Sequence, residues 1–184
     1  MNSQDEIRLQ IASLVNEYAE IEYQKRDFIP GESVIPVSGK VIDSEELKLM
    51  VEASLDGWLT TGRFTDQFQS KLANFIGVKH LLTTNSGSSS NLLAFTALTS
   101  NLLKDRAIKP GDEVITVAAG FPTTVNPILQ NNAIPVFVDI EHLTHNIDPQ
   151  KIEEAVSDKT KAIMLAHSLG NPFNLKVVMD ICRK

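Results

Sequence analysis

Residues 81–93 have the sequence LLTTNSGSSSNLL, in which a short apolar run breaks into a Gly/Ser turn and then resumes with helical spacing. A strand that leads through such a turn into a helix presents unpaired backbone N–H groups, hydroxyls and the positive end of the helix dipole at one point. The pattern therefore predicts a phosphate site within Ser86–Ser90. The segment alone leaves one alternative open, an ordinary N-capping cluster, because Ser is a favoured capping residue.

Short apolar runs alternate with helical patterns after this turn. We predict strands at His80–Thr84, Glu113–Val117, Ile134–Val138 and Lys161–Ala166, and helices near 88–103, 122–131 and 149–156. Such alternation, with nearly continuous apolar strands, is typical of a mostly parallel sheet with helices on both faces. The fold class is therefore α/β, and ligands are expected at the carboxyl edge of the strands.

The segment before residue 80 is predicted to be helical apart from an extended arm. Apolar residues that recur at three- and four-residue steps indicate amphipathic helices. Helices are expected over 7–18, over 44–55 with Asp43 or Ser44 as N-cap, and over 65–75 with Gly77 at the end. Two prolines and two glycines within 28–40 favour an irregular arm between the first two helices.

Two more loops follow predicted strands and reach the same edge of the sheet as the serine turn. The first, 118–124, carries Phe121, whose flat ring could stack on a heteroaromatic cofactor. The second, 167–172, carries the polar side chains of His167 and Asn171. Taken singly, Phe121 fits a core aromatic residue and His167 a structural histidine. Because all three segments lie at one edge, together they predict a ligand site.

Composition and charge exclude several classes of function. The 184 residues carry a net charge of −6 with a pI near 5.2, so no basic surface is expected for nucleic acid. The sequence lacks the GxxxxGK(S/T) and GxGxxG patterns of nucleotide sites.

The absence of a signal peptide and of a long apolar stretch predicts a cytoplasmic protein without a membrane segment. The single cysteine, Cys182, is interpreted as a small buried residue of the last helix, and no metal site is expected.

Six segments give the chain a resemblance to a known family. They are 56–62 (DGWLTTG), 84–88 (TNSGS), 110–115 (PGDEVI), 121–124 (FPTT), 135–140 (PVFVDI) and 167–172 (HSLGNP). In order and spacing they are similar to the nucleotide-sugar aminotransferase family often called DegT/DnrJ/EryC1/StrS. The resemblance implies the aspartate-aminotransferase-like large domain, known as PLP fold type I, and a pyridoxal phosphate cofactor. It also implies a helix and extended arm at 1–40, followed by an incomplete N-terminal portion of the large domain at 41–184.

In finer detail the chain resembles the CDP-4-dehydro-6-deoxyglucose 3-dehydratase branch of that family. The similarity lies in 38–42, 50–58, 118–127 and 155–162, and in the helical extension before residue 30. Matched position by position, the resemblance implies five cofactor-binding residues: Gly87 and Ser88 on the phosphate, Phe121 on the ring, and His167 and Asn171 at the mouth. It implies three residues near the sugar nucleotide: Thr60, Thr61 and Gly62.

The activity that this branch implies is removal of the C3 hydroxyl of a CDP-4-dehydro-6-deoxy-hexose, with pyridoxamine phosphate as electron sink, in dideoxysugar and lipopolysaccharide biosynthesis. In the branch, histidine replaces the Schiff-base lysine, and a 2Fe–2S cluster receives electrons from an iron–sulfur flavin reductase. The expected assembly is a homodimer. The catalytic residues and cluster ligands are expected beyond Lys184, so residues 1–184 alone are expected to be inactive. Two alternatives stay open: a PLP-dependent nucleotide-sugar aminotransferase, and a non-catalytic phosphate- or nucleotide-binding α/β module.

Overall fold

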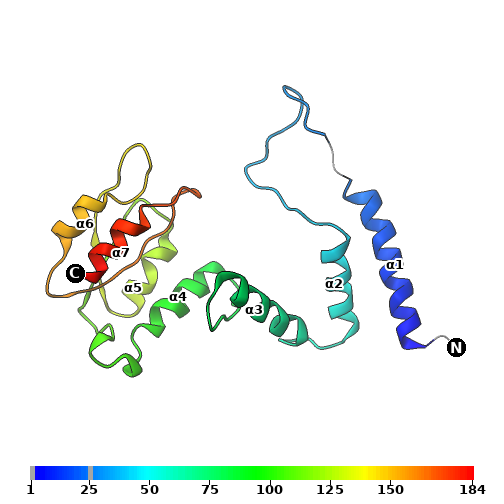
Figure 1. Cartoon of the computed structure of the whole chain (residues 1–184), viewed down its shortest axis with the longest axis horizontal. Coiled ribbons are helices and arrows are strands. Elements are labelled where there is room, and N and C mark those ends of the chain that lie inside the picture. The colour runs from blue at the N-terminus through cyan, green and yellow to red at the C-terminus, as the bar shows by residue number, and fades with distance from the viewer. Residues whose placement is uncertain (1–2, 25–26) are drawn as a thin grey trace. The chain divides into compact units, whose positions relative to one another are not determined.

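The structure, a computed structural model, describes residues 3–24 and 27–184 of the chain (Figure 1). The chain forms two compact units, Met1–Leu82 and Thr83–Lys184. The division at residue 40 that the family resemblance implies concerns the complete protein and stays a prediction.

The described residues of the first unit form three helices: α1 (Gln4–Glu22), α2 (Ser44–Leu55) and α3 (Arg63–Ile76). α1 and α2 pack against each other, and residues 27–43 form no helix or strand, as expected for the arm. The predicted caps are present because capping is a local interaction. Asp43 accepts a hydrogen bond from the Glu45 amide at the start of α2, and Gly77 ends α3 in the left-handed conformation with φ of 80°.

The second unit contains a parallel sheet of three strands: β1 (Glu113–Thr116), β2 (Ile134–Phe137) and β3 (Thr160–Ile163). β1 lies in the middle, with Ile115 opposite Val136 of β2 and opposite Ile163 of β3. Three of the predicted strands are thus confirmed. The parallel arrangement places the loops that follow these strands at one edge of the sheet.

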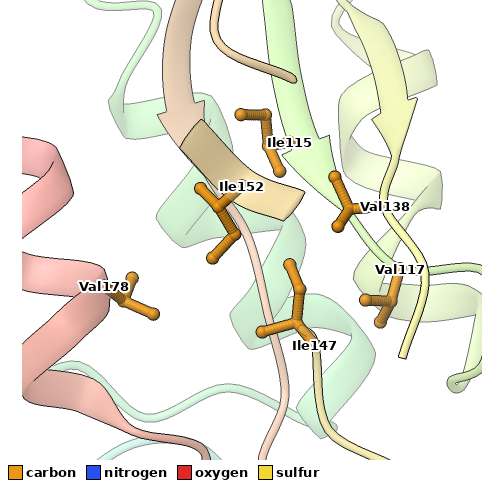
Figure 2. Close-up of a cluster of buried hydrophobic side chains, with 6 residues drawn as sticks. All are labelled: Ile115, Val117, Val138, Ile147, Ile152 and Val178. Carbon is orange, nitrogen blue, oxygen red and sulfur yellow. The ribbon is translucent and has the colours of Figure 1, made fainter. Parts of the chain in front are cut away.

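Helices cover both faces of this sheet. The α-helices are α4 (Gly87–Ala97), α5 (Asn126–Gln130), α6 (Pro149–Ala155) and α7 (Leu175–Arg183), with 3-10 turns η1 (Asn101–Arg106) and η2 (Pro122–Thr124). Val114 packs in a buried cluster with Phe95 of α4, and α5 contributes to the same cluster. Ile115 points to the opposite face, where Ile152 of α6 and Val178 of α7 join it (Figure 2). This is the predicted α/β architecture.

Three predicted elements differ from the structure, and one of them is the helix near 122–131, which divides into η2 and α5. His80–Thr84 forms no strand, because among the described residues it makes no backbone ladder with β2 or β3, and Leu82 is 70% exposed. A short apolar run becomes a strand only where a neighbour supplies hydrogen-bond partners. The helix expected over 88–103 ends at Ala97, and the Ser100 hydroxyl accepts the Leu102 amide at 3.3 Å, a local contact that begins the separate turn η1.

The interpretation of Cys182 as a buried residue is wrong, since its side chain is exposed. It lies in the last turn of α7. Val178 and Ile181 contact the buried cluster from this helix, and Cys182 falls beyond them. The contacts between α7 and this buried cluster therefore do not involve the thiol of Cys182.

Candidate functional site

The predicted phosphate site lies at the exposed N-terminus of α4. Ser86 is the N-cap, and its hydroxyl accepts the Ser89 amide at 3.2 Å, while the Ser90 amide donates to the Ser86 carbonyl at 3.0 Å. In the described part of the chain, the amides of Gly87 and Ser88 and the Ser88 hydroxyl have no hydrogen-bond partner. The capping and phosphate interpretations are thus compatible, because Ser86 caps the helix and leaves the next two amides free.

The loop after β1 lies beside this helix terminus. The side chain of Asn91, on α4, donates from Nδ2 to the Thr123 carbonyl at 3.2 Å. Ser88 and Thr123 also line one small cavity of about 150 Å³. Phe121, two residues before Thr123, is 71% exposed, so the interpretation of this ring as a core residue is wrong. The structure therefore brings the serine turn and the loop that carries Phe121 together, as the parallel sheet predicts.

A larger cavity of about 490 Å³ joins the loops after β1 and β3. Phe121 and Gly120 line it from the first loop, and His167 and Ser168 from the second. His145 also lines it, from a segment that the sequence did not single out. Such a space beside an exposed aromatic ring suits a flat heteroaromatic ligand.

His167 is held by contacts of a structural kind. Its Nδ1 accepts the Phe173 amide at 3.2 Å, and its ring stacks on Phe173 with centroids 4.3 Å apart and planes tilted by 32°. These two contacts fix the orientation of the imidazole at the cavity wall. His167 therefore has a structural role and also lines the cavity.

Asn171 lies in a contact between loops. Its Nδ2 donates to the Thr144 carbonyl at 3.3 Å, and its own carbonyl accepts from Asn146 Nδ2 at 3.0 Å. Asn146 is only 4% exposed and also accepts the Ser168 amide at 3.2 Å. This buried amide joins 144–146 to 168–171, and no sequence pattern predicted it. Asn171 is absent from the lining of the 490 Å³ cavity, and its assignment to the cofactor stays a prediction.

The predicted substrate loop lies in the first unit, between α2 and α3. Thr60 and Gly62 line a cavity of about 450 Å³ together with Trp58 and Arg63. The Trp58 indole donates from Nε1 to the Thr61 carbonyl at 2.7 Å. At Gly62 a Cβ atom would lie 2.9 Å from Trp58 Cδ1, so the indole occupies the space that a side chain would need. Trp58 and Arg63 were not predicted as site residues, although both lie within or beside the DGWLTTG segment.

Arg63 is held by carboxylates of α2 and its C-terminal end. Its Nε donates to Asp56 Oδ2 at 2.7 Å, and its Nη2 donates to Glu52 Oε1 at 3.1 Å. The guanidinium carbon also lies 4.2 Å from the ring centroid of Phe64. The hydrogen bond from Arg63 lowers the pKa of Asp56 below its ordinary value, and the same contact raises the pKa of Arg63. Both groups are therefore charged around neutral pH.

Two features are absent from residues 3–24 and 27–184. No group of three or more His, Cys, Asp or Glu side chains is placed to hold a metal ion. No helix in these ranges is long and apolar enough to cross a membrane.

The sequence profile of the DegT/DnrJ/EryC1/StrS aminotransferase family matches residues 40–184. The chain belongs to this family. The Lipopolysaccharide biosynthesis protein RfbH of Salmonella typhimurium (strain LT2) is 64% identical over 178 residues, which cover 97% of the chain and 41% of that relative. The dTDP-4-dehydro-2,6-dideoxy-D-glucose 3-dehydratase of Saccharopolyspora spinosa is 45% identical over 163 residues, 89% of the chain and 35% of that protein.

A solved family structure agrees with the fold. GDP-4-keto-6-deoxymannose-3-dehydratase, in a crystal structure with a trapped PLP-glutamate geminal diamine, is 34% identical and superposes with a TM-score of 0.73. The match covers 79% of this chain and 37% of that one. The expected PLP-dependent aminotransferase-like fold is thereby confirmed. The chain spans about two fifths of the length of the family members that it matches.

Proposed function

We propose that these residues form the N-terminal part of a pyridoxamine-phosphate-dependent CDP-4-dehydro-6-deoxyglucose 3-dehydratase of deoxysugar and lipopolysaccharide biosynthesis. The observation that carries this proposal is 45% identity to a protein named as a sugar-nucleotide 3-dehydratase. The 64% identity to a lipopolysaccharide biosynthesis protein supports the pathway class. Since the relatives are much longer than this chain, the activity belongs to the full-length protein.

The residues of the second unit fit a phosphorylated pyridine cofactor. The free amides of Gly87 and Ser88 and the Ser88 hydroxyl lie at the positive end of α4, which suits a doubly charged phosphate. Phe121 is exposed beside a cavity of about 490 Å³ and would stack on the ring. His167 would limit this space from the opposite loop, and Asn171 would fix that loop through its contacts with residues 144–146.

When bound, the cofactor supplies the electron sink for loss of the C3 hydroxyl. The residues described here bind and orient, and none of them is assigned a proton transfer. Thr60 and Gly62, which line the 450 Å³ cavity beside the indole of Trp58, are proposed to contact the sugar nucleotide there. Thr61, between them in the same turn, is proposed to contact it as well. The mixed apolar and polar lining of that cavity suits a base and a ribose better than an isolated anion.

Further properties of the full-length protein belong to the same proposal. They are a 2Fe–2S cluster reduced by an iron–sulfur flavin reductase, a homodimeric assembly and a cytoplasmic location. We also propose that residues 1–40, a helix followed by an extended arm, are not part of the large domain. The start of the family match at residue 40 supports this boundary.

The alternative function is that of a PLP-dependent nucleotide-sugar aminotransferase, which the name of the matching family favours. The two activities give different products from one substrate. Full-length protein is supplied with pyridoxamine phosphate, the reductase and its reductant, glutamate as an amino donor, and CDP-4-dehydro-6-deoxyglucose, and it should yield a 3-deoxy product by mass spectrometry. An amino sugar formed with consumption of an amino donor would overturn the dehydratase in favour of the transferase.

The cofactor site has its own test in the same full-length protein. We expect Ser88→Ala and Phe121→Ala each to weaken pyridoxamine phosphate binding about tenfold, through a lost charge-assisted hydrogen bond and a lost ring contact. Phe75→Ala is the matched control, because Phe75 is 89% exposed on α3. Calorimetric affinities that remain at the wild-type value in both variants would contradict the assignment.

A further inference from the structure

Two carboxylates of α2 would destabilise this helix if no cation lay near them. Glu52 and Asp56 are four residues apart and lie on one face of the helix, where like charges repel. Asp56 is also the C-cap of α2, at the negative end of the helix dipole. Cations close to both groups would offset this repulsion.

Two arginines from different helices supply these cations. Arg63 begins α3, and Arg8 reaches the same carboxylates from α1. Arg8 Nη1 lies 2.8 Å from Glu52 Oε1 and 3.2 Å from Asp56 Oδ1. The side chains of Arg8 and Asp56 are only 20% and 25% exposed. The charges of the four residues cancel, and one Glu52 oxygen accepts from both arginines.

The four residues Arg8, Glu52, Asp56 and Arg63 form an ion-pair network. This network extends to the wall of the 450 Å³ cavity. Arg63 and Asp56 both line that cavity, next to Trp58 and Gly62. The guanidinium of Arg63 is simultaneously drawn to the carboxylates and placed over Phe64. If Arg8 were absent, Arg63 alone would hold both carboxylates, and their mutual repulsion, compensated only in part, would favour their separation and move the arginine that bonds to both. The position of Arg63 therefore depends on a residue of α1.

We infer that Arg8 is a positioning residue, which holds Arg63 and the 58–62 turn in place through Glu52 and Asp56. α1 precedes residue 40, where the family match begins, so the cavity depends on a segment outside the shared family region. The relative that is 64% identical matches 97% of the chain and therefore includes most of α1. The nature of the ligand rests on the proposed function, whereas the positioning itself does not.

Trp58 allows a test without any ligand, because it is the only tryptophan of the 184 residues. In the 184-residue chain, Arg8→Ala should raise the acrylamide quenching of Trp58 and shift its emission. Arg8→Lys should give intermediate values, since an ammonium group lacks the planar fork of guanidinium. Lys71→Ala, which removes an exposed charge from α3, should match the wild type. Wild-type quenching in Arg8→Ala would overturn the inference.

If Arg8→Ala loses helical circular dichroism, Glu52→Gln decides the question. This variant leaves α1 untouched and removes the charge that both arginines share. Increased Trp58 quenching in Glu52→Gln supports the inference, and unchanged quenching overturns it.

Binding of CDP to the full-length protein separates this inference from the proposed function. We expect Arg8→Ala to weaken CDP binding about fivefold by calorimetry, because Arg63 and the 58–62 turn would no longer be held in place at the cavity. Equal affinity in the wild type and Arg8→Ala would contradict a role for Arg8 in binding. No CDP binding by the wild type, together with altered Trp58 quenching in Arg8→Ala, would refute the proposed ligand and leave the positioning role supported.

Discussion

At the scale of single residues, glycine is required at position 62 because Trp58 occupies the space that a side chain would need. Its φ of −153° is open to other residues, so its backbone conformation does not demand glycine. A Cβ atom at this position would instead lie 2.9 Å from Trp58 Cδ1. The indole that closes one side of the 450 Å³ cavity therefore keeps its place only next to a glycine.

We expect Gly62→Ala to displace the Trp58 ring and to break its hydrogen bond to the Thr61 carbonyl. The measurement is the emission maximum of Trp58, which should shift to longer wavelength as the indole gains solvent. Gly39→Ala serves as control, because no atom lies within 4 Å of a Cβ at that position. An unchanged emission spectrum in Gly62→Ala would show that the ring is not held against this residue.

Some features of the proposed sites could be predicted from the sequence and others could not, for physical reasons. The environment of Gly87 and Ser88 was predictable, since a helix N-terminus is defined by neighbouring residues in the chain. The exposure of Phe121 agrees with the role that the family resemblance implies but does not follow from its own segment. The burial of Asn146 follows from neither, because it depends on which loops meet in space. Arg8 was missed for the same reason: its partner Glu52 is 44 residues away in the sequence.

At the scale of secondary-structure elements, local signals predicted helices better than they predicted strands. The ends of α2 and α3 followed from Asp43 and Gly77, whose effects act within one turn. The failure at His80–Thr84 has a different cause, because strand pairing depends on distant segments. Apolar composition alone did not distinguish this segment from β1.

The junction of α1, α2 and α3 should depend on pH. The pKa of Asp56 lies below its ordinary value of 3.8, chiefly through the hydrogen bond from Arg63, with Arg8 adding to the effect. A lowered pKa in the folded state means that the ionised group stabilises the fold above about pH 4. This contribution is lost as the pH falls through the lowered folded pKa.

We therefore expect the thermal midpoint of the first unit, followed by Trp58 fluorescence, to fall on acidification below about pH 4. Asp56→Asn should have a lower midpoint at neutral pH and a weaker dependence on pH in this acid range. Asp66→Asn, at an exposed position of α3 outside the network, should retain the wild-type dependence. Parallel curves for Asp56→Asn and the wild type would exclude Asp56 as the titrating group.

At the scale of the whole molecule, the second unit depends on a sheet that is covered on both faces. Ile152 of α6 is fully buried against Ile115 of β1 and its neighbours (Figure 2). This arrangement was predictable as a class from the alternation of apolar runs and helical patterns. Its strand order was not, because the order depends on long-range pairing.

We expect Ile152→Ala to destabilise the second unit by roughly 2–5 kcal/mol, since the change leaves a cavity at the centre of the cluster. Amide hydrogen exchange of β1, measured in urea, reports this free energy for the unit concerned. Leu143→Ala is the control, because Leu143 is 96% exposed. A loss below about 1 kcal/mol in Ile152→Ala would mean that neighbouring side chains collapse into the space.

The location of Trp58 in the first unit has an optical consequence. The chain has two tyrosines, Tyr18 and Tyr23, and they too belong to Met1–Leu82. Near-ultraviolet absorbance and intrinsic emission of these 184 residues consequently originate almost entirely from the helical unit, because phenylalanine is the only aromatic chromophore of the sheet unit. A pyridoxal chromophore bound at Gly87 and Ser88 would thus share its unit with no tryptophan or tyrosine, so a change of Trp58 emission would report on the helical unit.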